Sequence, residues 1–208
     1  MSQLNILLQN SLDALKLELT AEQIAQLMAY TELLFQWNKV YNLTACEQMS
    51  DFIPLHLIDS LLAGKFLLGD AIIDVGTGAG LPGIPLAIYF PNKHFTLLDS
   101  RGKKIRFLHS VIETLKLKNV TLVNQRVEDY QPDARFTTVI TRAFAHLGQM
   151  LQVTEHLCDP KGLFLAMKGR YPITELASVP PNFVITLQQP VVIPGIEQER
   201  HIIGLIHK

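Results

Sequence analysis

The sequence predicts an α/β fold in which helices cover both faces of a mostly parallel, seven-stranded sheet. Two observations lead to this expectation. Residues 71–75 form an apolar run that ends in the turn Asp74-Val75-Gly76-Thr77-Gly78-Ala79-Gly80, and short apolar runs alternate with helical patterns from there onward. A glycine turn after a buried strand lets the backbone approach a ligand where any Cβ would collide. The chain is therefore expected to be an enzyme that holds a nucleotide-like cofactor.

The first part of the chain predicts helices, so we expect a helical extension over residues 1–68 and the cofactor-binding domain over residues 69–208. Thr20 and Gln23 fit a capping box, and the apolar residues that follow share one helical face. A second helix is expected over residues 54–67. In the connection between them, Trp37 and Tyr41 are interpreted as core residues, with stacking on a flipped base as the alternative.

From residue 71 onward the expected strands and helices alternate. Strands are expected at 71–75, 94–98, 120–124, 137–141, 162–167, 183–189 and 201–206, and helices at 81–90, 102–117, 146–157 and 173–178. Pro82 or Pro85 fits only the first turn of the helix after the glycine turn. The connection 190–199 is too short for a helical crossover, so the last two strands should form an antiparallel hairpin.

Length and composition limit the alternatives. The 208 residues suffice for one α/β domain with a small extension, and nearly half of them are apolar. No apolar run approaches the roughly 20 residues that a transmembrane helix needs, and the N-terminus does not resemble an export signal. Cys46 and Cys158 fit neither a disulfide framework nor a metal site. We therefore expect a cytoplasmic protein, a monomer without a bound metal.

The net charge of −1 is unevenly distributed along the chain. Residues 1–70 contain three basic and eight acidic residues, a net charge of −5, whereas residues 71–208 contain 15 basic and 11 acidic residues, a net charge of +4. This asymmetry permits a phosphate-binding face on the cofactor-binding domain, and an ordinary solvated surface explains it equally well.

The glycine turn is compatible with two kinds of cofactor. Residues 78–83 match the nicotinamide pattern G-x-G-x-x-G, with Asp99 about twenty residues on, but the match starts one glycine too late for a strand that ends at Val75. An acid at Asp74 suits the cationic amino-acid part of S-adenosylmethionine instead. Asp99, at the end of a strand, is placed to accept hydrogen bonds from ribose hydroxyls, or it only caps a helix. Glu128 could flank the adenine or be an ordinary surface acid.

The helix after Asp99 begins with Arg101, Lys103, Lys104 and Arg106, and their positive charge opposes the helix dipole. Some other group should therefore compensate for this unfavourable positive charge. Phosphates of a nucleic acid would do so, and nearby acids would also suffice.

Several motifs together closely resemble the bacterial 16S rRNA methyltransferase family known as RsmG, GidB or glucose-inhibited division protein B. The resemblance spans nearly the whole chain and rests on Asn38-Lys39-x-Tyr41-Asn42-Leu43-Thr44, His56-Leu57-Ile58-Asp59-Ser60, the glycine turn with Leu81-Pro82-Gly83-Ile84-Pro85, Leu97-Leu98-Asp99-Ser100, Thr141-Arg142-Ala143-Phe144 and Ala166-Met167-Lys168-Gly169. It implies a Rossmann-like class I methyltransferase that uses S-adenosylmethionine and methylates N7 of guanine 527 in 16S rRNA.

The resemblance also implies site residues. Those for the cofactor are Gly76, Leu81, Asp99, Ser100, Arg101, Val127, Glu128 and Arg142, to which the residue-level argument adds Asp74 and Gly78. Candidate contacts to RNA are Asn38, Lys39, Tyr41, Asn42, His56, Lys103, Lys104 and Lys168. Thr141 replaces a serine that is usual in the family, and Arg101 replaces a small or apolar residue. His56, Asp59 and Ser60 lie one helical turn apart, either as part of a site or as a bridge from the extension to the sheet.

The chemistry of guanine N7 agrees with this interpretation. N7 has a free lone pair, so its methylation needs no general base and depends mainly on positioning. Arg142 is the candidate for that role, through the cofactor or through guanine O6, because a bond to N7 would block the attack. Two alternatives stay open: a nicotinamide-dependent oxidoreductase, for which no Tyr-x-x-x-Lys pair is recognisable, and a non-catalytic RNA-binding or ribosome assembly factor. Whether the substrate is naked rRNA, the 30S subunit or an assembly intermediate stays open as well.

Overall fold

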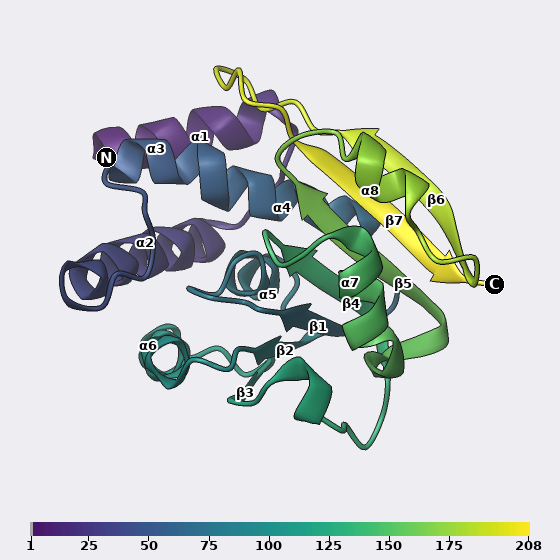
Figure 1. Cartoon of the computed structure of the whole chain (residues 1–208). Coiled ribbons are helices and arrows are strands. Elements are labelled where there is room, and N and C mark those ends of the chain that lie inside the picture. The colour runs from purple at the N-terminus through teal and green to yellow at the C-terminus, as the bar shows by residue number, and fades with distance from the viewer. Residues whose placement is uncertain (1) are drawn as a thin grey trace.

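The computed structural model describes residues 2–208 and contains one seven-stranded sheet with helices on both faces (Figure 1). Five strands run parallel: β1 (Ala71–Val75), β2 (His94–Leu98), β3 (Val120–Val123), β4 (Phe136–Arg142) and β5 (Cys158–Lys168). The strand order is β3-β2-β1-β4-β5-β7-β6. The order reverses between β1 and β4, and ligands of open α/β sheets bind at such a switch point.

The last two strands form the hairpin that the short connection predicts. β6 (Phe183–Pro190) pairs antiparallel with β7 (His201–His207), and β7 pairs antiparallel with β5. The other predicted strands are confirmed to within a few residues. β5 is the exception, because it begins at Cys158 instead of residue 162. Pro160 and Gly162 obscure its apolar pattern, and its register with β4 shifts between Phe136 and Thr138.

Each face of the sheet has its own hydrophobic cluster. One face is covered by α5 (Gly83–Tyr89), α6 (Gly102–Leu115) and the N-terminal helices α1 (Gln3–Ala14) and α2 (Ala21–Tyr41), and the other by α7 (Leu147–Thr154) and α8 (Ile173–Ala177) (Figure 1). Successive strand residues alternate between the clusters, as Ile72 and Ile73 illustrate. Pro85 lies in the first turn of α5, as predicted.

The N-terminal extension shares a core with the sheet. Leu8, Leu27 and Leu34 belong to the same buried cluster as Ile72 and Phe107. Gln23 completes the predicted capping box of α2. Two glutamines of α2 also reach the ends of neighbouring helices. Gln23 Nε2 donates to the Ile88 and Tyr89 carbonyls at 2.9 and 3.1 Å, and Gln26 Nε2 donates to the Leu115 carbonyl at 3.1 Å. These bonds occupy carbonyls at the C-termini of α5 and α6.

The predicted helix over residues 54–67 starts earlier and is less regular than expected. It begins with α3 (Met49–Phe52), widens into the π-helix η1 (Ile53–Ile58), and continues as α4 (Asp59–Ala63) and the short 3₁₀ segment η2 (Gly64–Phe66). The expectation that Pro54 starts the helix was wrong. Proline has no N–H to donate to the preceding turn, and the chain takes a wider turn there.

No helix within residues 2–208 combines the length and the apolar character that crossing a membrane requires.

Tyr30 connects the N-terminal extension to the glycine turn, and its loss should destabilise the protein. Its fully buried hydroxyl donates to the Ala79 carbonyl at 2.8 Å. Tyr30→Phe would leave that carbonyl unpaired, so we expect the free energy of unfolding to fall by about 1–3 kcal/mol in urea denaturation. Tyr41→Phe is the control, because the Tyr41 hydroxyl makes no hydrogen bond to any described residue. Equal stabilities for the two variants would contradict the anchoring role of Tyr30.

Candidate active site

The glycine turn is bonded to the end of the neighbouring strand. The Gly76 and Thr77 amides donate to the Leu98 carbonyl of β2 at 2.9 and 3.1 Å. Gly76, Gly78 and Gly80 have φ angles of +73°, +60° and +95°, a region that side chains disfavour. A Cβ at Gly80 would lie 2.5 Å from Ile84 Cγ1. The turn is thereby restricted both by its backbone conformation and by packing against α5.

Asp74, on the strand that precedes the turn, holds the turn in place through hydrogen bonds. Its side chain is fully buried, and Oδ2 accepts hydrogen bonds from Thr77 Oγ1 at 2.7 Å and from the Gly83 amide at 2.8 Å. Its other oxygen, Oδ1, has no partner among residues 2–208. Burial raises the pKa of the Asp74 carboxyl to about 7, although both hydrogen bonds oppose this effect. A cation bound nearby would favour the ionised form.

Asp99 joins the glycine turn to the start of α6. Its carboxylate accepts hydrogen bonds from the Gly78 amide at 2.9 Å and from the Arg101 amide at 2.8 Å. Asn124 Nδ2 fixes the Asp99 backbone through its carbonyl at 2.9 Å. Asp99 therefore organises local backbone and also lines a cavity, and its contact with ribose hydroxyls stays a prediction.

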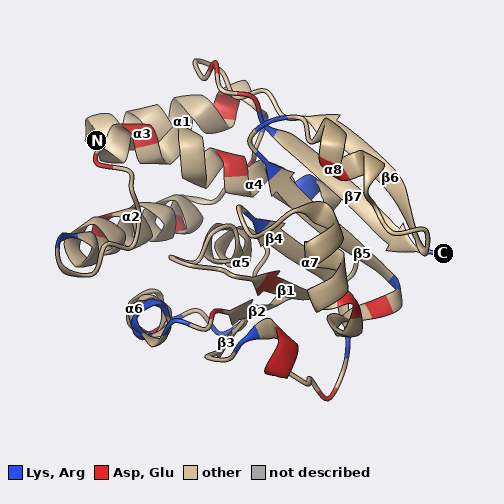
Figure 2. Ribbon diagram, viewed as in Figure 1, with Lys and Arg blue, Asp and Glu red and all other residues tan. Residues whose placement is uncertain are grey.

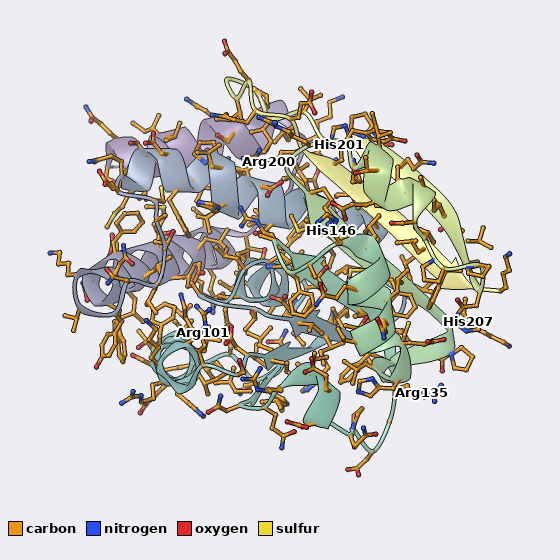
Figure 3. The ribbon with its side chains drawn as sticks, in the orientation of Figure 1. Arg101, Arg135, His146, Arg200, His201 and His207 are labelled. Atoms are coloured by element: carbon orange, nitrogen blue, oxygen red, sulfur yellow. The ribbon has the colours of Figure 1, made fainter. Side chains whose placement is uncertain are left out.

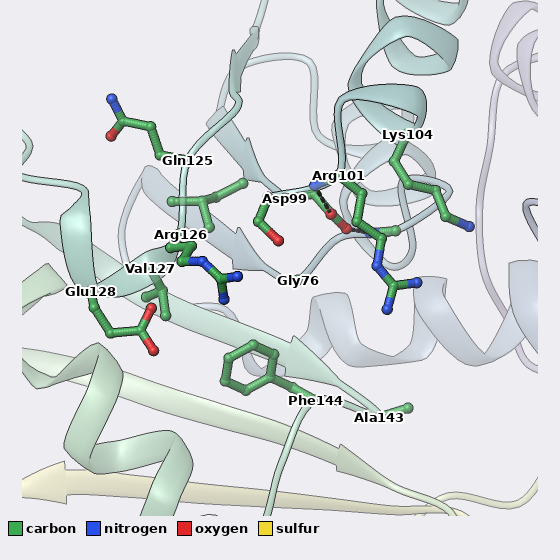
Figure 4. Close-up of a pocket in the computed structure, with 13 residues that line it drawn as sticks. Gly76, Asp99, Arg101, Lys104, Gln125, Arg126, Val127, Glu128, Ala143 and Phe144 are labelled. Atoms are coloured by element: carbon green, nitrogen blue, oxygen red, sulfur yellow. Dashed lines mark hydrogen bonds between the residues drawn. The ribbon is translucent and has the colours of Figure 1, made fainter.

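A cavity of about 390 Å³, hereafter the cofactor cavity, opens at the carboxyl ends of β1 to β4 (Figure 4). Many of the predicted cofactor residues line it: Gly76, Gly78, Asp99, Ser100, Arg101, Val127 and Glu128. Figure 4 shows the Phe144 ring close to Gly76, with Glu128 extending toward the same space. The cavity thus has the composition expected of an adenosine-binding site, with acids for hydroxyl groups and glycines for close approach.

Sequence reasoning missed other lining residues: Leu98, Gln125, Arg126, Ala143 and Phe144, together with Lys104, which was predicted for RNA. Gln125 and Arg126 follow β3 one residue after its end, and Ala143 and Phe144 directly follow β4. The position at a carboxyl strand end was the available signal, because all parallel strands end at the same edge of the sheet.

Three predicted cofactor residues do not line the cofactor cavity. Asp74 lies beneath the glycine turn, as described above. Leu81 packs against the core cluster on the α5 side of the sheet. Arg142 lines the neighbouring cavity instead. Any contact of these residues with a cofactor stays a prediction.

This second cavity of about 280 Å³, hereafter the basic cavity, adjoins the first at the end of β4. Its lining residues are Asp59, Arg142, Ala143, Met167, Lys168, Gly169 and Arg200. Arg142 Nε lies 3.5 Å from Asp59 Oδ2, and Arg142 Nη2 donates to the Leu55 carbonyl at 3.1 Å and bonds to His56 Nδ1. Arg200 Nε lies 3.9 Å from the same Asp59 oxygen. One buried carboxylate therefore holds two guanidinium groups.

His56 takes part in this cluster as a neutral base. Burial lowers the pKa of its imidazole to about 4, and the charges of Arg142 and Arg200 act in the same direction. With Nδ1 accepting from Arg142, the proton belongs on Nε2. His56 and Asp59 thus connect the N-terminal helices to the end of β4, the bridging alternative considered from the sequence.

The prediction that Lys104 faces RNA phosphates was wrong. Lys104 is buried, and its Nζ donates to the Leu43 carbonyl at 2.6 Å, while Lys103 Nζ donates to the Tyr41 carbonyl at 3.1 Å. Tyr41 is the last residue of α2, at the negative end of its helix dipole, and Leu43 follows two residues later. The basic start of α6 is therefore compensated by backbone carbonyls of the extension. Arg106 is exposed.

The Asn38–Thr44 motif also has a local structural role. Asn38 Oδ1 accepts hydrogen bonds from the Leu43 and Thr44 amides at 2.6 and 2.9 Å, just beyond the end of α2. Asn42 has a left-handed backbone as the C-cap. Tyr41 stacks on Trp37 with ring centroids 5.2 Å apart, and both are partly buried against the core, as the interpretation as core residues expects, while the contact of Tyr41 with RNA stays a prediction. Lys39 is exposed, and its contact with RNA stays a prediction.

Within residues 2–208, no group of three or more His, Cys, Asp or Glu side chains is arranged to hold a metal ion.

Comparisons with known proteins give a consistent result. A family model described as rRNA small subunit methyltransferase G matches residues 23–203. The ribosomal RNA small subunit methyltransferase G of Idiomarina loihiensis is 47% identical over 196 residues, 94% of this chain and 95% of the relative. The protein of the same name from Alteromonas mediterranea is 46% identical over 206 residues, 99% of this chain and 98% of the relative.

Among solved structures, the chain resembles the magnesium protoporphyrin IX methyltransferase from Synechocystis with bound S-adenosylmethionine. The TM-score is 0.60 at 16% identity, with 92% of this chain and 99% of the other covered. At such low identity this likeness shows the fold alone, and it confirms the predicted class I methyltransferase architecture.

Gly76→Val should abolish cofactor binding in a folded protein. The new Cβ would lie 2.7 Å from Phe144 Cδ2, and a β-branched residue tolerates a φ of +73° poorly. Titration calorimetry with S-adenosylmethionine measures the loss. Gly195→Val is the matched control, because Gly195 also has a positive φ of +80° but nothing within 4 Å of its Cβ position. Near-parental affinity in folded Gly76→Val would show that the turn is not the cofactor site.

Lys104→Gln should lower stability. The variant removes the buried hydrogen bond to the Leu43 carbonyl, so we expect a loss of about 1–3 kcal/mol in the free energy of unfolding. Arg106→Gln, on the exposed side of the same helix, should be neutral or slightly stabilising because it removes a charge that opposes the dipole. Urea denaturation measures the free energy of unfolding of both variants and tests this difference. A Lys104→Gln variant as stable as Arg106→Gln would restore an RNA-facing role for Lys104.

Proposed function

Since the chain belongs to the rRNA small subunit methyltransferase G family, we propose that it methylates N7 of a guanine in 16S rRNA, the base conventionally numbered 527. The methyl donor is S-adenosylmethionine. We further propose that it acts in the cytoplasm as a monomer on the 30S subunit or an assembly intermediate.

The observation that carries this proposal is the meeting of the two cavities at Ala143. Ala143 lines both the cofactor cavity and the basic cavity. Methyl transfer requires donor and acceptor atoms to approach in line, with each reactant held on its own side. The cofactor cavity suits the donor, and the basic cavity offers guanidinium groups for an electron-rich base.

The residues at the glycine turn fit S-adenosylmethionine. The Oδ1 atom of buried Asp74 has no hydrogen-bond partner among residues 2–208, and a cationic ligand nearby would favour the ionised form of this carboxyl. Gly76 leaves open a space that a Cβ would fill. Asp99 and Glu128 line the cavity with acceptors for ribose hydroxyls and adenine. Bound there, the cofactor supplies an electrophilic methyl group on its sulfonium.

The basic cavity suits a guanine that reacts at N7. The N7 lone pair forms the new bond to the methyl carbon while the carbon–sulfur bond breaks, and no proton leaves N7. A general base is therefore unnecessary, which agrees with the bond that already joins His56 Nδ1 to Arg142. Arg142 Nη1 has no hydrogen bond to the described residues, so it can donate to guanine O6 without covering N7.

The surface around the basic cavity suits an RNA backbone. Lys and Arg gather where β4, β5 and β7 meet near α4 (Figure 2). Arg200 and His146 lie on this side of the molecule, and Arg135 and His207 lie at the opposite edge of the sheet (Figure 3). Exposed Arg170 follows β5 on the same edge as Arg200. We therefore place the RNA-binding face here instead of on α6.

Family membership favours methyl transfer over nicotinamide-dependent oxidation. If the protein binds RNA but transfers no methyl group, that result would support the alternative of a non-catalytic assembly factor. Labelled-methyl transfer to 30S subunits that lack the modification, followed by mass spectrometric mapping, tests the proposal. The expected product is one 7-methylguanine at position 527, and Gly76→Val should give none. Incorporation at another base or atom would overturn the assignment.

Arg142→Gln should lower kcat by about 10²–10³-fold, because it removes the charge that positions the base. Cofactor affinity, measured by calorimetry without RNA, should change little because Arg142 does not line the cofactor cavity. Arg135→Gln, at the opposite edge of the sheet, is the control and should leave both quantities unchanged. A loss of cofactor affinity equal to the loss of activity would instead make Arg142 a cofactor residue.

A further inference from the structure

The loop at residues 143–146 forms the boundary between the two cavities, yet its own conformation is unfavourable. It joins β4 to α7, and Ala143 within it has a φ of +48°, which costs a non-glycine residue energy. The next residue, Phe144, is 36% exposed although its ring lines the cofactor cavity. External contacts must therefore hold this loop in place.

Two side chains from distant positions supply these contacts. Lys168 Nζ, at the end of β5, donates to the Ala145 carbonyl at 2.7 Å. Glu175 Oε2, on α8, accepts a hydrogen bond from the Leu147 amide at 2.8 Å. The two side chains bond to each other at 2.7 Å, and each is only 16% exposed. The pair thus forms hydrogen bonds with the backbone on both sides of His146, at the Ala145 carbonyl and the Leu147 amide.

Glu175 also replaces a missing helix cap. His146, the N-cap of α7, makes no side-chain capping bond, so the Leu147 amide depends on the carboxylate from α8. Burial raises the pKa of Glu175, but hydrogen bonds from Lys168 and the Leu147 amide outweigh it and hold the pKa below its usual value. The carboxylate is therefore ionised, as a cap at the positive end of a helix should be.

We propose that Lys168 and Glu175 form a latch that positions the 143–146 loop, and that both are positioning residues for methyl transfer. The latch sets where Phe144 stands against Gly76 and where Ala143 separates the two cavities. It also accounts for Lys168 without an RNA contact, because the Lys168 amine is already engaged by a carboxylate and a carbonyl. The catalytic part of this inference rests on the proposed methyltransferase function.

Variants of both partners test the latch. Lys168→Met keeps the length of the side chain without its donor, and Glu175→Ala removes the acceptor. Each should speed hydrogen exchange at the Leu147 amide and weaken cofactor binding about 3- to 10-fold, because the loop walls the cofactor cavity. Each should lower kcat about 10- to 100-fold through misplacement of reacting groups. The double variant should be no worse than either single one, because the two residues act as a unit.

Glu155→Ala is the matched control. Glu155 is also a partly exposed carboxylate, but it is bonded at 2.9 Å to His207, which lies at the opposite edge of the sheet (Figure 3). It should leave Leu147 exchange, cofactor affinity and kcat unchanged. If Glu175→Ala does not fold, Glu175→Gln keeps an acceptor for the Leu147 amide and should give smaller effects in the same direction.

The salt dependence of RNA binding separates the latch from a phosphate contact. The latch predicts the same salt slope for Lys168→Met as for the parent. A slope reduced by about 0.7, with Glu175→Ala unaffected, would make Lys168 a phosphate contact and overturn the proposal. Hydrogen exchange and cofactor affinity need no RNA. A latch can therefore be refuted even if the methylated base is not the one proposed, and failure of methylation by the parent would refute only the proposed function.

Discussion

The close approach of the glycine turn to the end of β2 is the constraint on which the site depends. Gly76 and Thr77 share one carbonyl of Leu98, and Gly78 bonds to the carboxylate of Asp99. A side chain at Gly76 would meet Phe144, and one at Gly80 would meet Ile84 of α5. Asp99 and Tyr30 therefore hold the turn through its backbone, at the Gly78 amide and the Ala79 carbonyl, and Asp74 holds it through the Thr77 hydroxyl.

The N-terminal extension is best understood from this constraint. A glycine-rich turn loses more conformational freedom on folding than other sequences, so it needs support. α2 provides that support through Tyr30, and it also makes hydrogen bonds with the ends of α5 and α6. The π-helical turn that follows carries His56 to Arg142. The extension thus supports the turn beside the cofactor cavity, and Asp59 of the extension lines the basic cavity.

Much of the fold could be predicted from the sequence, because alternation, capping and turn residues are local signals. The strand pattern, the hairpin at the C-terminus and the Thr20–Gln23 cap follow from neighbours in the chain. The cofactor cavity was largely predictable as well, since its residues follow strand ends. The hydrogen-bond partners of Lys103, Lys104 and Lys168 could not be predicted from the sequence. Each lysine binds a carbonyl or carboxylate whose position depends on how distant elements pack.

The failure to predict the partners of these three lysines has one physical cause. A lysine that is seen only in sequence is assigned to solvent or phosphate, because isolated burial of its charge is costly. Backbone carbonyls at helix C-termini and loop turns are equally good acceptors, and they leave no trace in the sequence. The charges of Arg142 and Arg200 are compensated only in part, because the single carboxylate of Asp59 faces both guanidinium groups. Both guanidinium groups line the basic cavity, where the proposed reaction requires an electron-rich base to be held.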